Sequence, residues 1–182
     1  MSYPVRNQNG EVYWSSDDGA TFYSLPADAT SPPLSSLITV AFDPEFDGNN
    51  VVYATSSAAD KGVYRFKIGT SREWERIDSN LPSGGTLNQV LVASDGTLYA
   101  TNSQPENGME RCLNPTYTLG PTFETVTRGL SDGATLSGLW RHGHSIWSVD
   151  SARTWLMTFD IPSPRRWPLT HRFTRLPAPA QS

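Results

Sequence analysis

Short runs of alternating apolar and polar residues recur along this chain, and none has the i, i+3, i+4 spacing of an amphipathic helix. The run VVYATSS at 51–57 returns as TLYATNS at 97–103 and as SIWSVDS at 145–151. The interval from Tyr53 to Tyr99 is 46 residues, and Trp147 follows 48 residues later. Each copy is the second of four short apolar runs, which predicts repeated four-stranded antiparallel sheets.

This period indicates an all-β fold, a β-propeller built of four-stranded antiparallel blades. A closed propeller has about 4–8 blades, and this chain accounts for about three and a half. Residues 1–160 are expected to form a partial or small propeller, and 161–182 a Pro/Arg-rich tail in which RRWPL at 165–169 faintly resembles a fourth strand of the last blade. The predicted boundaries are a half blade at 11–25, blades at 37–80 and 87–130, and a last blade from 136 to 160 and onward.

Composition supports this picture and excludes some partners. The 14 Gly, 14 Pro and 20 aromatic residues favour short strands and tight turns. No apolar stretch reaches the about 18 residues of a membrane span, and the N-terminus lacks the apolar core of an export signal. The net charge is −4. The tail has four arginines and no acidic residue, whereas the rest of the chain has a charge of −8. Because the main part of the chain is acidic, no nucleic-acid partner is expected.

The stretch SSDDGATF at 15–22 reads as a turn that locks a hairpin. Asp17 is placed to accept backbone N–H groups of the turn, and Gly19 supplies a backbone angle that side chains resist. The pattern Ser15-x-Asp17-x-Gly19-x-Thr21-Phe22 resembles the Asp-box (BNR) repeats of sialidases, sortilin-type receptors and bacterial surface propellers. The resemblance implies a structural turn between the third and fourth strands of a blade, with Phe22 inserted between blades. It also implies that Asp17 and its neighbour Asp18 are not a catalytic pair.

By pattern, residues 11–160 resemble the repeat-rich propellers of bacterial cell-surface and S-layer-like proteins. The resemblance implies an extracellular or cell-surface protein that acts as a non-enzymatic scaffold or recognition module. The alternative is a carbohydrate-active, glycoside hydrolase- or sialidase-like propeller fragment, or a sugar-binding module. No recognisable catalytic pair is present, so the question of an enzyme stays open and leans toward no. Trp140, Trp147 and Trp155 are candidates for stacking on a ligand, and packing between blades is the other interpretation.

Other constellations predict no cofactor and no metal site. The stretch from Asp43 to Gly48, DPEFDG, imitates a calcium loop, but Ala54 stands where an EF-hand has its last carboxylate, so a hairpin turn is expected. The pair His142 and His144 lacks further ligands, and Cys112, the single cysteine, is expected to be buried. The expected partners are a glycan or protein ligand and a second copy, because two sets of three and a half blades make seven. The alternatives are a four-bladed ring closed within one chain, in which residues 11–25 complete the last blade, and a larger assembly.

Overall fold

The computed structural model describes residues 5–6, 11–25, 34–59, 62–79, 81, 85–104, 107–151, 155–160 and 173–175. These residues form four antiparallel sheets, named here first to fourth along the chain, and a single turn of helix, α1 (Phe46–Asn49). The all-β fold class with four-stranded antiparallel sheets is therefore confirmed. No helix in the described part of the chain is long and apolar enough to cross a membrane.

Each sheet is a meander in which consecutive strands pair with each other. The first sheet contains β1 (Val5–Arg6), β2 (Val12–Trp14) and β3 (Tyr23–Leu25), and the second contains β4 (Ile38–Phe42), β5 (Val51–Ser56), β6 (Val63–Lys67) and β7 (Glu75–Arg76). The third contains β8 (Leu87–Val92), β9 (Leu98–Asn102), β10 (Met109–Cys112) and β11 (Phe123–Val126). The fourth contains β12 (Leu136–His142), β13 (Ser145–Asp150), β14 (Trp155–Asp160) and β15 (Phe173–Arg175).

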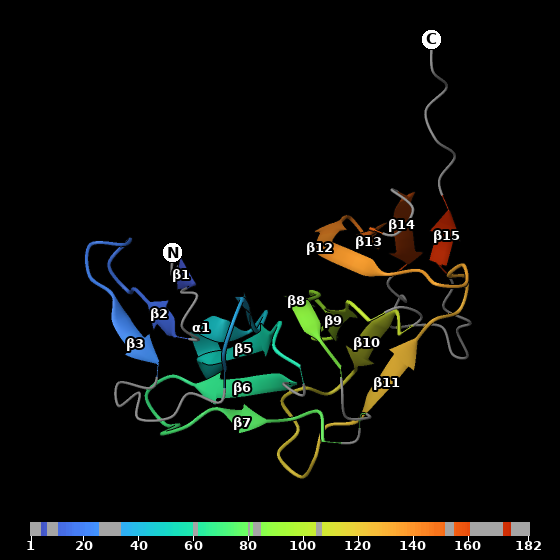
Figure 1. The fold of residues 1–182 in the computed structure, drawn as a ribbon. Helices are drawn as coiled ribbons and strands as arrows, with labels where there is room; N and C mark the ends of the chain where they lie inside the picture. The colour runs from blue at the N-terminus through green and yellow to red at the C-terminus, as the bar shows by residue number, and fades with distance from the viewer. Residues whose placement is uncertain are drawn as a thin grey trace.

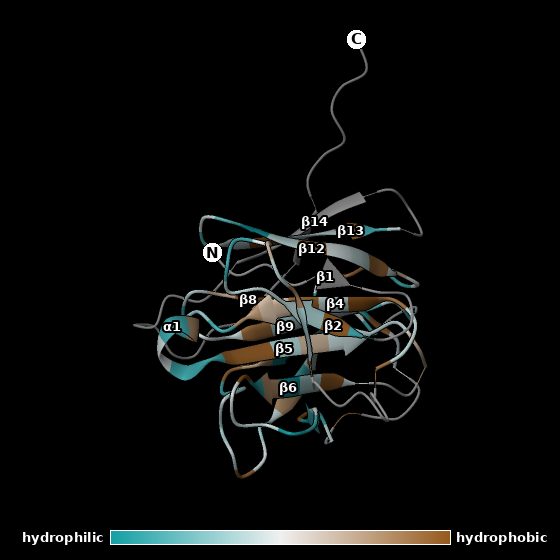
Figure 2. Ribbon diagram, turned by 90° about the vertical axis from the view of Figure 1, so that its left-hand side faces the viewer, coloured by the Kyte–Doolittle hydropathy of each residue, from teal (hydrophilic) through white to brown (hydrophobic). Residues whose placement is uncertain are grey.

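Apolar side chains fill the spaces between successive sheets. Tyr53 and Val63 of the second sheet pack with Leu98 and Phe123 of the third, and separate clusters join the first sheet to the second and the third to the fourth. Every residue of β5, β9 and β10 is buried, because these strands have a neighbouring sheet on both faces. Figure 2 shows the same apolar band along β5 and β9.

The sheets follow one another along an arc (Figure 1). Strand β8 contacts both β4 and β12, so the first strands of the second, third and fourth sheets are neighbours. Burial alternates along β13, where Ile146, Ser148 and Asp150 are buried and the residues between them are partly exposed. The fourth sheet is thus covered by the third on one face, and its other face is partly open among the described residues.

The ends of the chain differ from the sequence prediction. The first sheet has three described strands where a two-strand half blade beginning at residue 11 was expected, because β1 pairs with β2. The fourth sheet receives its fourth strand, β15, from the segment 161–182 that was expected to be a tail. The faint strand expected at 165–169 lies outside the described residues. Three-residue strands with little alternation carry too weak a pattern to be detected in sequence.

Candidate functional site

A cavity of about 630 Å³ lies between the second and third sheets, within the size range of ligand pockets. Four connections surround it: the β4–β5 connection with α1, the β6–β7 turn, the β8–β9 turn, and the loop of residues 113–122 between β10 and β11, called here the β10–β11 loop. The charged side chains of its lining are Asp43, Glu45, Arg65, Lys67, Glu75 and Asp95. The cavity is therefore polar, and both sheets contribute to it.

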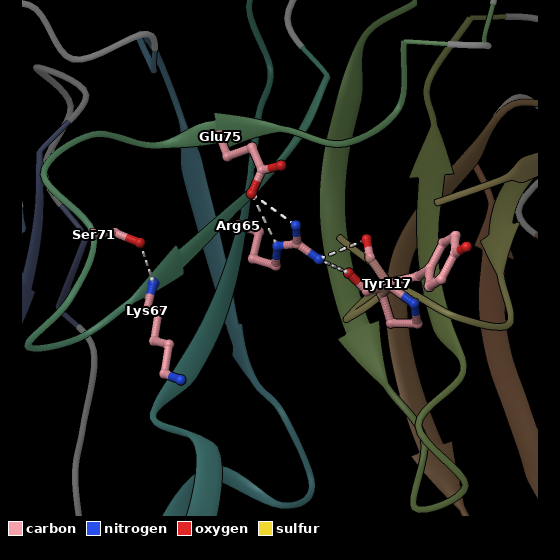
Figure 3. Close-up of polar contacts among 6 residues, drawn as sticks. Arg65, Lys67, Ser71, Glu75 and Tyr117 are labelled. Carbon is pink, nitrogen blue, oxygen red and sulfur yellow. Dashed lines mark hydrogen bonds and ion pairs between the residues drawn. The ribbon is translucent and has the colours of Figure 1, made fainter. Parts of the chain in front are cut away.

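Arg65 ties the two sides of this pocket together (Figure 3). Its guanidinium is buried and donates through Nε and Nη2 to Glu75 Oε2, at 3.2 and 2.7 Å, on the neighbouring strand β7. Its Nη1 donates to the backbone carbonyls of Pro115 at 2.7 Å and Tyr117 at 3.1 Å in the third sheet. One side chain of the second sheet thus fixes the backbone of the β10–β11 loop.

Asp43 organises the other wall of the pocket. Its buried carboxylate accepts hydrogen bonds from Asn49 Nδ2 at 2.8 Å, from the Tyr53 hydroxyl at 2.9 Å and from the backbone N–H of Glu45 at 3.0 Å. Burial, and next the Asp43 charge, raise the pKa of Tyr53 far above its usual value, so this hydroxyl remains a donor. The expected hairpin turn at DPEFDG contains the helical turn α1, and its first carboxylate holds the connection to β5.

The Arg65 arrangement is repeated in the third sheet. Across β5, β6 and β7 the register places Tyr53 opposite Arg65 and Arg65 opposite Glu75. Across β9, β10 and β11 it places Tyr99, Arg111 and Glu124 in the same order, and Arg111 donates to Glu124 Oε1, through Nε at 2.7 Å and also through Nη2. The fourth sheet has Trp147, Thr158 and Thr174 at these positions.

Sequence reasoning missed Arg65 and Arg111 as members of a site. A signal was present, because the two arginines are 46 residues apart, the same interval that separates Tyr53 from Tyr99. Their role depends on cross-strand pairing with glutamates in short, weakly patterned strands. Sequence periodicity locates the repeat but does not show which side chains meet across it.

A second polar group, Glu110, is buried between the same two sheets and is not part of the pocket lining. Its carboxyl accepts hydrogen bonds from Thr125 Oγ1 at 2.8 Å and from Asn102 Nδ2 at 3.4 Å. Burial raises the pKa of Glu110, and the nearby charge of Asp78 adds to this effect. Asp78 is itself buried and accepts from Arg76 Nε at 2.8 Å.

The SSDDGATF segment forms a turn between β2 and β3. Ser15 Oγ donates to Asp17 Oδ1 at 2.7 Å, the same oxygen accepts the Thr21 N–H at 2.9 Å, and Ser15 Oγ accepts the Gly19 N–H at 2.9 Å. The hydrogen bonds that the Asp17 carboxylate accepts lower its pKa; the bond from Ser15 has the largest effect, followed by those from Thr21. Phe22, which the resemblance expects between blades, is 43% exposed. The turn thus holds itself together through local hydrogen bonds.

Trp140 and Trp147, two of the three tryptophans considered for ligand stacking, are not part of the pocket lining. Trp140 is 42% exposed on β12 and is opposite the partly exposed Trp147 on β13. Because Leu139 and Ile146 face the third sheet, the alternation of strand side chains places Trp140 and Trp147 on the other face. Trp155 begins β14, opposite Asp150. Trp140 and Trp147 thus lie on the face of the fourth sheet that is turned away from the third.

His142, His144 and Cys112 are not part of the pocket lining, although the Cys112 thiol donates to Oδ1 of the lining residue Asn114 at 3.4 Å. His142 and His144 are both exposed at the β12–β13 turn, and no group of three or more His, Cys, Asp or Glu side chains in the described part of the chain is arranged to hold a metal ion. Cys112 is buried, as expected, and burial raises the pKa of its thiol, which disfavours the reactive thiolate. These groups do not join the pocket between the second and third sheets.

Solved structures with the same arrangement of sheets identify the fold. The structure titled "YCF48 bound to D1 peptide" matches 96% of this chain and 49% of its own, with a TM-score of 0.59 and 13% identity. The "Crystal structure of Nidogen/Laminin Complex" matches 88% of this chain and 55% of its own, with a TM-score of 0.61 and 14% identity. The matched proteins are β-propellers. This chain is a partial β-propeller.

The partial propeller spans about half the length of the structures that it matches. A gluconolactonase of Xanthomonas campestris shares the fold, with a TM-score of 0.50, 14% identity, and coverage of 86% of this chain and 46% of that one. No protein-family model and no curated protein matches the chain. At these identities the likeness shows the fold alone.

Proposed function

We propose that this partial β-propeller is a non-enzymatic scaffold and recognition module, with the pocket between its second and third sheets as the ligand site. One observation carries the proposal: the buried charged groups of the pocket are committed to holding the walls. Arg65, which pairs with the exposed Glu75, fixes the β10–β11 loop, and Asp43 fixes the β4–β5 connection. A pocket whose walls are held in this way presents a preformed surface, which favours binding. Two of the matched structures, by their titles, hold a peptide or a protein partner.

A screen for turnover tests this proposal against the enzyme alternative. Xyloglucan, sialosides and related glycans are incubated with the chain, and released sugars are measured for the wild type and for Glu45→Gln in the pocket. We expect no turnover in either protein. Turnover by the wild type that Glu45→Gln abolishes would show a carbohydrate-active enzyme and would overturn the proposal.

The sugar-binding alternative depends on Trp140. An exposed indole is a typical platform for a sugar ring, and Trp140 is 42% exposed beside Trp147. A titration of tryptophan fluorescence with the same glycans, repeated with Trp140→Ala, decides this alternative. A saturable signal that Trp140→Ala removes would place the ligand on the fourth sheet instead of in the pocket.

The proposal includes a bacterial cell-surface location and a second copy as partner. The location depends on the sequence resemblance to surface propellers, and protease treatment of intact cells tests it, because a surface protein is cleaved without lysis. The second copy depends on the partly open face of the fourth sheet. The mass of the protein in solution tests it.

A further inference from the structure

The β10–β11 loop, which lines the pocket through residues 113–116 and 118, carries three exposed apolar side chains. Leu113, Tyr117 and Leu119 are all exposed, and Leu119 is 83% exposed. The other large apolar side chains that are exposed in the described residues are Phe22, Tyr23, Leu37 and Trp140, which lie in the other three sheets and their connections. Scattered apolar residues are ordinary on a protein surface, whereas three within seven residues mark an interaction surface.

The backbone of this loop is fixed in advance. Arg65 Nη1 donates to the carbonyls of Pro115 and Tyr117, and the Tyr117 N–H donates to the Asn114 carbonyl at 3.0 Å. Figure 3 shows Arg65 reaching the loop from the neighbouring sheet. Because the loop is already ordered, a partner that binds its side chains loses less free energy to ordering than one that binds a flexible loop.

The charges beside the loop specify the partner. The pocket lining contains the carboxylates of Asp43, Glu45 and Asp95, in addition to Glu75, which is paired with Arg65. Lys67 is the remaining cation of the lining. Three carboxylates against one ammonium give this side of the loop a negative potential, which attracts a basic partner and repels an acidic one.

We infer that the β10–β11 loop and the pocket bind an extended peptide segment of a partner protein in which a Lys or Arg lies beside an apolar side chain. The apolar side chain packs on Tyr117 and Leu119, and the basic side chain enters the pocket toward Glu45 and Asp95. This inference rests on the proposed recognition function and names its partner class.

Selection from a random peptide library displayed on phage tests this inference with the full chain as bait. Enriched sequences are expected to contain Lys or Arg next to an apolar residue. A synthetic peptide of the enriched sequence is then titrated by fluorescence anisotropy, together with a version that carries Glu in place of its basic residue. We expect the Glu version not to bind and wild-type affinity to fall with added salt. Leu119→Ser and Glu45→Gln are each expected to weaken binding about fivefold.

Two variants serve as controls, because both change exposed side chains outside the pocket lining. Glu73→Gln matches Glu45→Gln, and Leu37→Ser matches Leu119→Ser; neither is expected to change affinity. The inference would be overturned if the selection enriched no peptide or only peptides without basic residues. It would also be overturned if neither Leu119→Ser nor Glu45→Gln weakened binding. Peptide binding at another place on the chain would contradict this inference but not the proposed recognition function. Glycan turnover would contradict the proposed recognition function itself.

Discussion

Glu110, only 3% exposed between the second and third sheets, makes the stability of the fold depend on pH. Burial raises its pKa above that of the unfolded chain, so the folded state binds a proton that the unfolded state releases. The free energy of unfolding should therefore fall as the pH rises from the unfolded pKa, about 4.3, through the raised folded pKa. Glu110→Gln removes this contribution and keeps an acceptor for Thr125.

We expect Glu110→Gln to match the wild type at low pH and to be more stable at neutral pH. Urea denaturation at a series of pH values measures the difference between the two proteins. Glu73→Gln, at an exposed position, should follow the wild-type curve. A difference between Glu110→Gln and wild type that does not change with pH would contradict the prediction.

Gly19 supplies a backbone angle in the SSDDGATF turn that residues with a Cβ resist. Its φ is +88°, and an added Cβ would meet only the Phe22 ring at 3.8 Å, which is an ordinary contact. The cost of Gly19→Ala therefore comes from the backbone angle and should be about 1–2 kcal/mol of unfolding free energy. Gly48→Ala is the control, because Gly48 lies in α1, has no positive φ, and has open space where the Cβ would be. Equal effects of the two substitutions in thermal denaturation would show that φ is not the cause.

At the scale of elements, Arg65 joins the β10–β11 loop of the third sheet to β6 and β7 of the second. Arg65→Ala removes a partly buried charge-assisted pair and two bonds to loop carbonyls, so it should destabilise the fold by about 2 kcal/mol. It should also speed amide hydrogen exchange in residues 113–119 more than elsewhere. Lys67→Ala, on the same strand and exposed, should change neither quantity much. Uniformly faster exchange in Arg65→Ala would mean that Arg65 stabilises the whole fold without fixing the loop.

The pattern of apolar residues in the sequence is sufficient to locate the long strands but not the short ones. Strands β5 and β9 have strong apolar runs, and the repeat located both, with Tyr53 and Tyr99 in register positions opposite Arg65 and Arg111. Strands β1, β7 and β15 have only two or three residues, and two of the three were missed or displaced. Such strands form because neighbouring strands offer hydrogen-bond partners, which is a tertiary effect that their own residues do not encode.

At the scale of the whole molecule, the partly open face of the fourth sheet predicts association. Trp140 and Trp147 lie on this face, which in a longer propeller would be covered by another blade. Light scattering on a sizing column should give about twice the 20.0 kDa of one chain, and Trp140→Glu should shift the mass toward one chain. Leu119→Glu, on the β10–β11 loop, is the control and should leave the mass unchanged.

The dimer expected from the structure differs in its number of blades from the dimer that the sequence predicts. The described residues of each chain form four sheets, and β15 already completes the fourth, so two copies bring together eight described sheets instead of seven. Eight is within the range of about 4–8 blades for closed propellers. A monomeric wild type across a dilution series, or a Trp140→Glu variant that still forms the dimer, would contradict association through the fourth sheet.

The sequence by itself determined the class of fold, the repeat and the SSDDGATF turn. These features depend on local periodicity and on hydrogen bonds between residues a few positions apart, such as Asp17 and Thr21. Only the tertiary structure decided the pocket, because its walls come from segments about 50 residues apart, as Arg65 and Pro115 show. It also decided the positions of Phe22 and Trp140, since exposure depends on which sheet lies next to a side chain. The alternation of apolar and polar residues predicts that one face of a strand is buried. Which sheet covers that face is determined by the packing of the sheets.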